Sequence, residues 1–279
     1  MHAYPWTARL HHFALGTPDP VRLAEFYSTT LLMEAGEAGD FQYCHGPERH
    51  MLFAPGKASS LVFGAYSLAN DAQLQARRRH LESKQVVINP SPSPLFDGRA
   101  FSFQDPEGNT IVLGVADDPP SAKRDVDIGA RLQHLVLTSP EPEKLAGFYS
   151  DKVGFWPSDQ AEDDDGVVRS IWLRTDHEHH SFAVFTGSSA VDHFSFELND
   201  WNGIRDWSDY FSSFDIELIW GPGRHGPGNN LFIFIVDPDG NKIELSAEMD
   251  SYSVHRPLGV WPFNRKAYNL WGAAPLRVG

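Results

Sequence analysis

Alternating apolar and polar positions predict β-strands at matching places in the two halves of the chain. In residues 9–15, RLHHFAL, the side chains of Leu10, His12 and Ala14 alternate with their neighbours as strand residues do. Residues 131–137, RLQHLVL, repeat that pattern. We therefore expect each half to begin with a strand that carries a histidine at the same place.

A helix is expected directly after each of these strands. Asp19 and Glu141 each precede a proline, and proline is tolerated in the first turn of a helix. Residues 72–84 and 201–214 predict a second helix in each half. Each half then closes with a tight turn of the form DPxGN and a short strand. The pattern predicts an α+β fold of four β-α-β-β-β modules, paired into two similar domains.

The two halves are copies of one unit. RLAEFYS, beginning at residue 22, returns as KLAGFYS at residue 144, an offset of 122 residues that the first strands share. The DPxGN turns at Asp105 and Asp237 are offset by 132, so the second copy carries a few inserted residues. Residues 117–127, DDPPSAKRDVD, are typical of a linker. We predict an N-terminal domain over residues 1–118 and a C-terminal domain over residues 128–279.

Composition narrows the class of protein. The 279 residues are 41% hydrophobic and 13% aromatic, which excludes a disordered chain. A formal charge of −14 disfavours nucleic acid and anionic membranes as partners. Cys44 is the only cysteine, so no internal disulfide forms and a reducing compartment is favoured. No signal-peptide core or membrane-length apolar run is present, and we expect a cytoplasmic protein.

Three strand positions differ together between the two copies. The second copy carries His134, His193 in VDHFSFEL and Glu244 in KIELS. The first copy keeps His12, but its matching strand has no histidine, and Val112 stands where the second copy has its glutamate. Two histidines and one carboxylate are the ligand set of an Fe(II) facial triad, and they also suit Mn(II) or Zn(II). We predict a metal site in the C-terminal domain and none in the N-terminal domain.

Each of these residues also has an ordinary structural explanation. A single strand histidine is more often a hydrogen-bonded core or surface residue than a ligand, and His12 is expected to be such a residue. Glu244 lies between two apolar residues and would face solvent on an edge strand. The second copy has both His193 and Glu244, whereas the first copy has neither. This favours the metal site, because independent drift is not expected to keep or lose both residues together.

The tandem modules, the His-His-Glu triad confined to the second half, and the GRH sequence before the last strands resemble the two-domain extradiol catechol dioxygenases. These enzymes belong to the vicinal oxygen chelate superfamily, and the resemblance extends over residues 9–250. It implies a ring-cleaving dioxygenase that binds Fe(II), with Mn(II) as the alternative, through His134, His193 and Glu244. An aromatic diol and O2 would be its substrates. A homo-oligomer and a role in aromatic hydrocarbon catabolism are also implied.

The resemblance further assigns two histidines to catalysis. HHSFAV places His180 where the family has a histidine over the oxygen-binding face, and GRH places His225 where a histidine hydrogen-bonds a substrate oxygen. Proton transfer by His180 suits a side chain whose pKa lies near the working pH. His179 is the alternative, since loop length could shift the register by one. Without the resemblance, DHEHHS predicts a polar hairpin tip and GPGRHGPGNN an exposed loop.

An apolar substrate pocket is expected beside the metal. Its candidate lining residues, each equally well explained as core, are Trp172, Phe182, Phe194, Phe196 and Phe232. The family has a tyrosine ten residues before the glutamate, whereas this chain has Phe234, which cannot donate a hydrogen bond. Asn230 and Tyr252 are candidates to supply the missing donor. The aromatic tail, residues 255–272, is expected to cover either the pocket mouth or a subunit interface.

Two other functions remain open at this point. One is a metalloenzyme of the same superfamily, an isomerase or epoxide-opening transferase, that chelates vicinal oxygens without oxygen chemistry. Those enzymes usually draw ligands from more than one pair of modules, unlike the triad predicted here. The other is a drug-sequestering protein with an aromatic groove and no metal. The metal content of the purified protein distinguishes the drug-sequestering protein, which binds no metal, from the dioxygenase and from the isomerase or transferase.

Overall fold

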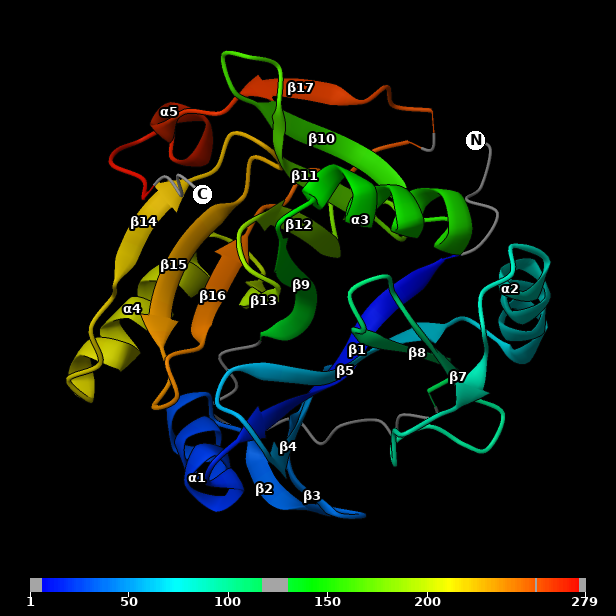
Figure 1. Cartoon of the computed structure of the whole chain (residues 1–279). Coiled ribbons are helices and arrows are strands. Elements are labelled where there is room, and N and C mark those ends of the chain that lie inside the picture. The colour runs from blue at the N-terminus through cyan, green and yellow to red at the C-terminus, as the bar shows by residue number, and fades with distance from the viewer. Residues whose placement is uncertain (1–6, 117–129, 254, 276–279) are drawn as a thin grey trace.

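The computed structural model describes residues 7–116, 130–253 and 255–275. The predicted linker, residues 117–127, lies outside the described residues. None of the helices in these ranges has the length and apolar character needed to cross a membrane. The chain folds as two domains, with the N-terminal one running from blue to blue-green and the C-terminal one from green to red (Figure 1).

The N-terminal domain contains the first two modules. Its elements are β1 (Ala8–Thr17), α1 (Pro20–Thr30), β2 (Glu34–Ala38), β3 (Phe41–Gly46), β4 (Arg49–Pro55), β5 (Ser60–Leu68), α2 (Asp71–Ser83), β6 (Asn89–Pro90), β7 (Phe101–Gln104) and β8 (Thr110–Gly114). They form one sheet in the order β2-β3-β4-β1-β5-β8-β7-β6. Helix α1 begins as predicted, because the Asp19 side chain accepts a hydrogen bond from the Arg22 backbone N–H at 3.1 Å.

The C-terminal domain repeats this arrangement and adds to it. Its elements are β9 (Arg131–Ser139), α3 (Pro142–Phe148), the π-helical turn η1 (Tyr149–Val153), β10 (Trp156–Glu162), β11 (Val168–Arg174), β12 (Phe182–Thr186), β13 (Ala190–Leu198), α4 (Trp201–Ser213), β14 (Trp220–Arg224), β15 (Leu231–Val236), β16 (Lys242–Ala247), β17 (Gly259–Pro262) and α5 (Arg265–Tyr268). The sheet order is β14-β15-β16-β13-β9-β12-β11-β10-β17. The four predicted modules are confirmed, and the tail supplies β17 and α5.

A β-bulge in the first strand of each domain changes which side chains share a face. Opposite β13, the register shifts between Leu132 and His134, which leaves Gln133 as the extra residue. Leu132 therefore joins the large core on one face, whereas His134 and Val136 lie on the other. The same shift follows Leu10 in β1. The prediction from strand alternation, which placed Leu132 on the same face as His134 and Val136, was therefore wrong for Leu132.

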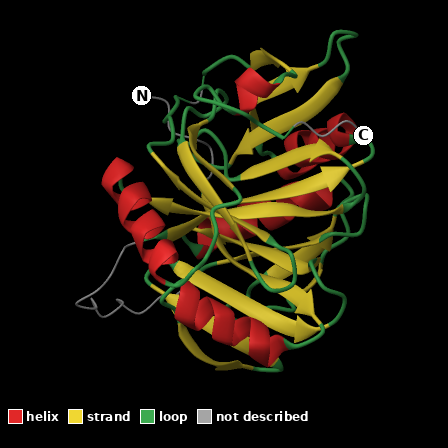
Figure 2. Cartoon of the chain, turned by 90° about the vertical axis from the view of Figure 1, so that its left-hand side faces the viewer, coloured by secondary structure: helices red, strands yellow, loops and turns green. Residues whose placement is uncertain are grey.

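The large apolar core runs through both domains. Helices flank the strand layers (Figure 2) and contribute buried residues such as Leu23 of α1 and Trp207 of α4. Across the domain boundary, Phe13 of β1 packs on Phe194 of β13 with ring centroids 4.6 Å apart. The backbone N–H of Leu132 donates to the carbonyl of Glu48 at 3.0 Å. The two domains therefore share one core on this face.

The aspartate of each DPxGN turn also joins the domains. Asp237 Oδ2 accepts a hydrogen bond from Tyr27 Oη, and Asp105 Oδ2 accepts one from Tyr149 Oη, both at 2.9 Å. Each aspartate also accepts two backbone N–H groups of its own turn. The repeated FYS and DPxGN sequences are thus explained, because the tyrosine of each copy reaches the turn of the other copy.

Removing either tyrosine hydroxyl is expected to destabilise the protein. In Tyr27→Phe or Tyr149→Phe a buried carboxylate loses one donor, and a hydrogen bond to a charged group contributes about 1.5–3 kcal/mol. Urea denaturation should show a loss of that size in the free energy of unfolding. Tyr210→Phe is the control, since the hydroxyl of partly exposed Tyr210 donates to a backbone carbonyl, that of Thr29. Equal losses in all three variants would contradict this account of the turns.

Candidate metal centre

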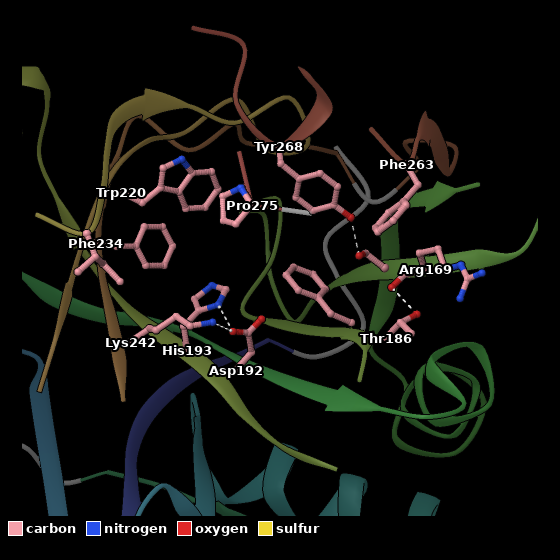
Figure 3. A pocket seen from close by; sticks show the side chains of 13 residues that line it. Arg169, Thr186, Asp192, His193, Trp220, Phe234, Lys242, Phe263, Tyr268 and Pro275 are labelled. Atoms are coloured by element: carbon pink, nitrogen blue, oxygen red, sulfur yellow. Dashed lines mark hydrogen bonds and ion pairs between the residues drawn. The ribbon is translucent and has the colours of Figure 1, made fainter. Parts of the chain in front are cut away.

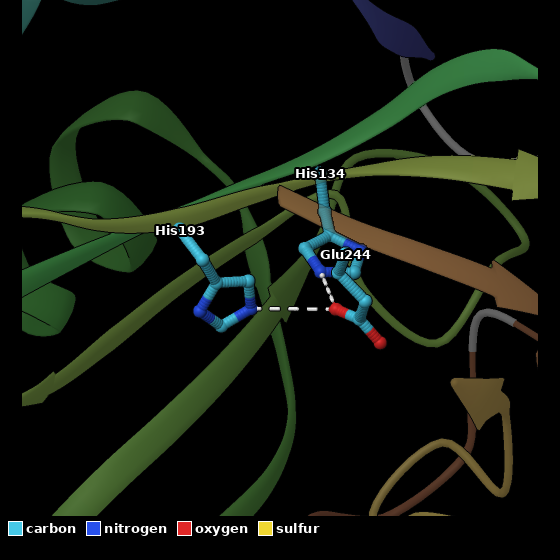
Figure 4. Close-up of side chains that lie close together, drawn as sticks. All are labelled: His134, His193 and Glu244. Atoms are coloured by element: carbon cyan, nitrogen blue, oxygen red, sulfur yellow. Dashed lines mark hydrogen bonds and ion pairs between the residues drawn. The ribbon is translucent and has the colours of Figure 1, made fainter. Parts of the chain in front are cut away.

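Three neighbouring strands bring the predicted ligands onto one face of the C-terminal sheet. On the central strand β13, Ser195 lies opposite His134 of β9 on one side and Glu244 of β16 on the other. His193 lies two residues earlier on β13 and therefore faces the same way. The ligand atoms of His134, His193 and Glu244 all lie within 4.8 Å of one another. Figure 4 shows both imidazoles directed at the same carboxylate oxygen.

The distances suit a divalent metal. His134 Nε2 lies 2.9 Å from Glu244 Oε2, and His193 Nε2 lies 3.4 Å from the same atom. Two ligands at right angles on bonds of about 2.1 Å are about 3 Å apart, so these separations match adjacent positions around one ion. The donor set, two imidazoles and a carboxylate, fits Fe(II), Mn(II) or Zn(II) equally.

Burial and mutual charge set the protonation of the triad. Burial raises the pKa of Glu244, but His134, His193 and His225 outweigh it and hold that pKa well below its ordinary value. Burial lowers the pKa of His134 despite the opposing carboxylate. His193 differs, because Asp192 and Glu244 raise its pKa against the effect of burial. Metal binding therefore finds an ionised Glu244 and a neutral His134, and protons compete with the metal more strongly at His193 than at His134.

Side chains behind the triad fix the ligands in place. Gln133, the bulge residue, lies with its Oε1 3.1 Å from His134 Nδ1, so His134 donates there and keeps Nε2 for the metal. Asp192 Oδ1 lies 3.6 Å from His193 Nδ1 and also pairs with a lysine side chain. Asn230 Nδ2 donates to Glu244 Oε1 at 3.1 Å. Both imidazoles thus present Nε2, and Glu244 presents Oε2.

The two histidines assigned by resemblance lie beside the triad. His225 Nδ1 donates to the backbone carbonyl of Tyr268 at 2.6 Å, and its Nε2 lies 3.4 Å from Glu244 Oε1. The His180 ring lies 4.3 Å from the His134 ring, centroid to centroid. Burial, then His134 and His179, lowers the pKa of His180 well below its ordinary value, so its imidazole is neutral. His180 and His225 line one small cavity of about 50 Å³ together with the triad.

The matching place in the N-terminal domain is filled. Register puts Phe63 where the other domain has His193, and Val112 where it has Glu244. His12 Nε2 is hydrogen-bonded to Ser93 Oγ at 2.6 Å, and Phe96 packs against the same imidazole. Phe63, Phe96 and Val112 belong to a small apolar cluster. Within the described residues, His134, His193 and Glu244 form the only group that could hold a metal, and the N-terminal domain has no counterpart of it.

Val112→Glu is expected to create no second metal site. The new carboxylate would lie near His12, but Phe63 supplies no third ligand, and a buried unpaired charge in this cluster lowers stability. Metal analysis should still give one ion per chain, and urea denaturation should show a loss of stability. Val112→Ala serves as the control for the lost side-chain volume. Two ions per chain in Val112→Glu would contradict the alignment of the domains.

An apolar pocket opens beside the triad. It has a volume of about 200 Å³, and Figure 3 shows the side chains that surround it. Its aromatic and aliphatic lining residues are Phe185, Ile219, Trp220, Phe234, Phe263, Tyr268 and Pro275. His193 borders both this pocket and the small cavity of the triad. The metal centre therefore lies next to a space large enough for an aromatic ring.

Several predicted pocket residues lie elsewhere. Phe182 of β12 and Phe194 and Phe196 of β13 lie in the large core. On β13, His193 and Ser195 take the site face, so the alternate residues Phe194 and Phe196 take the other. Tyr252 donates to Asp250 and packs on His179. The remaining predicted residues lie around the metal centre: Trp172 and Phe234 line the small cavity, Phe232 stacks on His225, Asn230 binds Glu244, and His179 lies behind His180.

The tail and β14 supply pocket residues that the sequence did not assign. Phe263 and Tyr268 of the tail, with Pro275 beyond it, line the pocket, so the tail forms part of its wall. Trp220, the first residue of β14, stacks on Phe234 with ring centroids 5.1 Å apart. The cluster of aromatic residues in the tail was the available signal, but no sequence pattern indicated which sheet edge the tail joins.

Comparison with known proteins identifies the family. The model of the Glyoxalase/Bleomycin resistance protein/Dioxygenase superfamily matches residues 9–113 and again residues 131–245. The chain belongs to this superfamily. The family predicted from the repeated modules is therefore confirmed, and so is the predicted fold.

Curated relatives in the superfamily include several dioxygenases. Metapyrocatechase 2 of Cupriavidus necator is 23% identical over 91% of this chain and 84% of its own length. A manganese-dependent 2,3-dihydroxybiphenyl 1,2-dioxygenase of Geobacillus genomosp. 3 is 24% identical over 85% of this chain and 84% of its own. An iron-dependent extradiol dioxygenase of Rhodococcus jostii is 25% identical over 72% of this chain and 74% of its own. The last two relatives depend on different metals, as their names state.

Solved structures in the superfamily share the two-domain architecture. Homoprotocatechuate 2,3-dioxygenase of Arthrobacter globiformis superposes with a TM-score of 0.82 over 98% of this chain and 90% of its own, at 20% identity. The Mn(II)-bound glyoxalase of Novosphingobium aromaticivorans also gives 0.82, over 96% of this chain and 91% of its own, at 21% identity. The shared fold alone does not separate a dioxygenase from a glyoxalase, so function is argued from the site.

Proposed function

We propose that this protein is a metal-dependent extradiol dioxygenase, which cleaves the ring of a catechol-type diol with O2. The observation that carries the proposal is the buried His-His-Glu triad with His180 beside His134 and His225 beside Glu244, next to an apolar pocket. The relatives named as dioxygenases support it, since their similarity spans both domains. Fe(II) is the proposed metal, and Mn(II) fits the same ligands.

The side chains around the triad suit binding and proton transfer. A bound metal would hold the diol and dioxygen next to each other and conduct electrons between them. His225 is fixed by its hydrogen bond to the Tyr268 carbonyl, so its Nε2 is the nitrogen left to accept a proton from a substrate hydroxyl. His180, on another side of the cavity, is placed for proton exchange with the reacting oxygen atoms. Phe234 supplies no donor, and His225 is the residue to which we assign the contact with the diol.

The pocket favours a diol with an uncharged, apolar substituent. Among the described lining residues, Lys242 pairs with Asp192 at 3.0 Å and Arg169 pairs with Asp163 at 2.7 Å. Ser170 and Tyr268 share a hydrogen bond. These polar groups are already engaged, whereas Trp220, Phe185 and their neighbours present apolar surface. An aromatic substituent gains from burial there, and a carboxylate would lose its hydration without a new partner.

An oxygen electrode tests both parts of the proposal. Protein loaded anaerobically with Fe(II), and separately with Mn(II), would be given air and catechol, 2,3-dihydroxybiphenyl or 3,4-dihydroxyphenylacetate. We expect oxygen uptake and a yellow product, with the highest kcat/KM for 2,3-dihydroxybiphenyl. A preference for the carboxylate-bearing diol would contradict the substrate class. Bound metal without oxygen uptake on any diol would favour a non-oxygenase metalloenzyme of the superfamily.

Trp220→Ala is expected to lower kcat/KM for 2,3-dihydroxybiphenyl by about 10–100-fold and for unsubstituted catechol much less. The indole lines the pocket, and losing the burial of a ring-sized substituent costs about 1.5–3 kcal/mol. Initial rates on both substrates with the same preparation give the ratio. Trp201→Ala, at an exposed tryptophan of α4, is the control. Equal losses on both diols would place Trp220 outside the substituent pocket.

A further inference from the structure

A chain of three buried polar side chains connects the C-terminal tail to the metal centre. His180 Nδ1 lies 2.9 Å from His179 Nδ1, and His179 Nε2 lies 3.0 Å from Asp159 Oδ2. His179 is 0% exposed and Asp159 is 1% exposed, so water does not compete for these contacts. Sequence reasoning assigned no role to Asp159. The contacts nevertheless connect Asp159 through His179 to His180, which is a proposed catalytic residue.

The tail holds the Asp159 carboxylate in place. Trp261 of β17 donates through Nε1 to Asp159 Oδ2 at 2.9 Å, and Arg256 lies 2.7 Å from Asp159 Oδ1. The Arg256 guanidinium also lies over the ring of Tyr252 at 3.9 Å. Burial raises the pKa of Asp159, but His179, Arg256 and Trp261 outweigh it and lower that pKa, so the carboxylate is ionised. An ionised carboxylate accepts hydrogen bonds and cannot donate them.

Asp159 and His179 are in direct contact, and the direction of the hydrogen bond between His179 and His180 follows from this contact. Burial lowers the pKa of His179 even though Asp159 opposes it, so its imidazole is neutral and carries a single proton. Asp159 favours that proton on Nε2, which leaves His179 Nδ1 as an acceptor. His180 Nδ1 must then carry the proton of the 2.9 Å contact. The other nitrogen of His180, Nε2, is left unprotonated, and the His180 side chain lines the small cavity.

We infer that Asp159 and His179 are positioning residues that fix His180 as its Nδ1–H tautomer and leave His180 Nε2 ready to accept a proton in the metal centre. The arrangement resembles the way a buried carboxylate orients a catalytic histidine, with a second histidine inserted between them. The tail contributes by orienting Asp159. The expected effect on the turnover rate rests on the proposed function, whereas the inferred tautomer of His180 does not depend on it.

The tautomer can be measured in the metal-free protein. Long-range ¹H–¹⁵N spectra of histidine-labelled protein distinguish Nδ1–H from Nε2–H imidazoles, and His180→Phe assigns the signal. We expect Nδ1–H for His180 and Nε2–H for His179. His179→Asn should preserve the His180 tautomer, because the amide oxygen can accept in place of Nδ1, and His179→Leu should shift it towards Nε2–H. An Nε2–H imidazole at His180 in the wild type, or no shift in His179→Leu, would overturn the inference.

Kinetics of the metal-loaded protein test the consequence. Substituting a residue that orients a functional side chain typically lowers activity about 10–100-fold. His179→Leu should therefore lower kcat by about that factor with KM nearly unchanged. His179→Asn should stay within about threefold of the wild type. Metal content and thermal stability show whether each variant is folded. If both variants lose kcat alike, His179 has only a structural role. If the wild type turns over no diol, the spectra still decide the tautomer while the proposed function fails.

Discussion

Glu244→Ala is expected to lose nearly all bound metal. Glu244 is 1% exposed and contributes the oxygen on which both imidazoles converge. A change behind a metal ligand typically costs about 10–100-fold in affinity, so removal of a ligand should cost at least about 100-fold. Elemental analysis after anaerobic loading and desalting gives the ion count per chain. The wild type should gain thermal stability on adding metal, since binding to the folded state stabilises it, and the variant should not.

Two further variants make the result decisive. Glu244→Gln keeps the shape of the buried side chain, so a loss of metal in this variant cannot be attributed to a cavity. Glu143→Ala, at an exposed glutamate of α3, should retain one ion per chain. Near-normal metal content in both Glu244 variants would remove this residue from the ligand set. The comparison of the two domains would then lack its main support.

His180→Phe is expected to lower kcat by about 10²–10⁴-fold while leaving the metal bound. Positioned proton transfer contributes a factor of this size, and phenylalanine retains the ring that packs 4.3 Å from His134 but has no nitrogen. Oxygen uptake under saturating diol measures kcat, and elemental analysis measures the metal. His177→Gln is the matched control, since His177 belongs to the same DHEHHS segment but is exposed. Loss of metal in His180→Phe would instead indicate a role in binding the ion.

The architecture could be read from the sequence because the chain is duplicated. The repeated FYS and DPxGN sequences indicated two copies of one domain. The structure explains the repeats, since Tyr27 and Tyr149 each donate a hydrogen bond to the DPxGN turn of the other domain. Comparing the copies also separated His193 and Glu244 from ordinary strand residues. A single copy of the domain would not have permitted that distinction.

The pocket was harder to predict, for physical reasons. Once His193 faces the site, strand alternation places Phe194 on the opposite face, so the choice of Phe194 conflicted with the choice of His193. The bulge at Gln133 has no sequence signature of its own, yet it decides which face His134 takes. Asp159 lies on a strand remote from the triad in sequence, and only the tertiary contact with His179 reveals it.

The most direct test of the account is metal content and oxygen uptake measured on one preparation of wild-type protein. The account predicts one Fe(II) or Mn(II) per chain and one O2 consumed for each 2,3-dihydroxybiphenyl cleaved. The yellow ring-opened product should appear at the same rate. Protein that binds no metal under anaerobic loading, yet is folded, would contradict the metal centre and with it the proposed function.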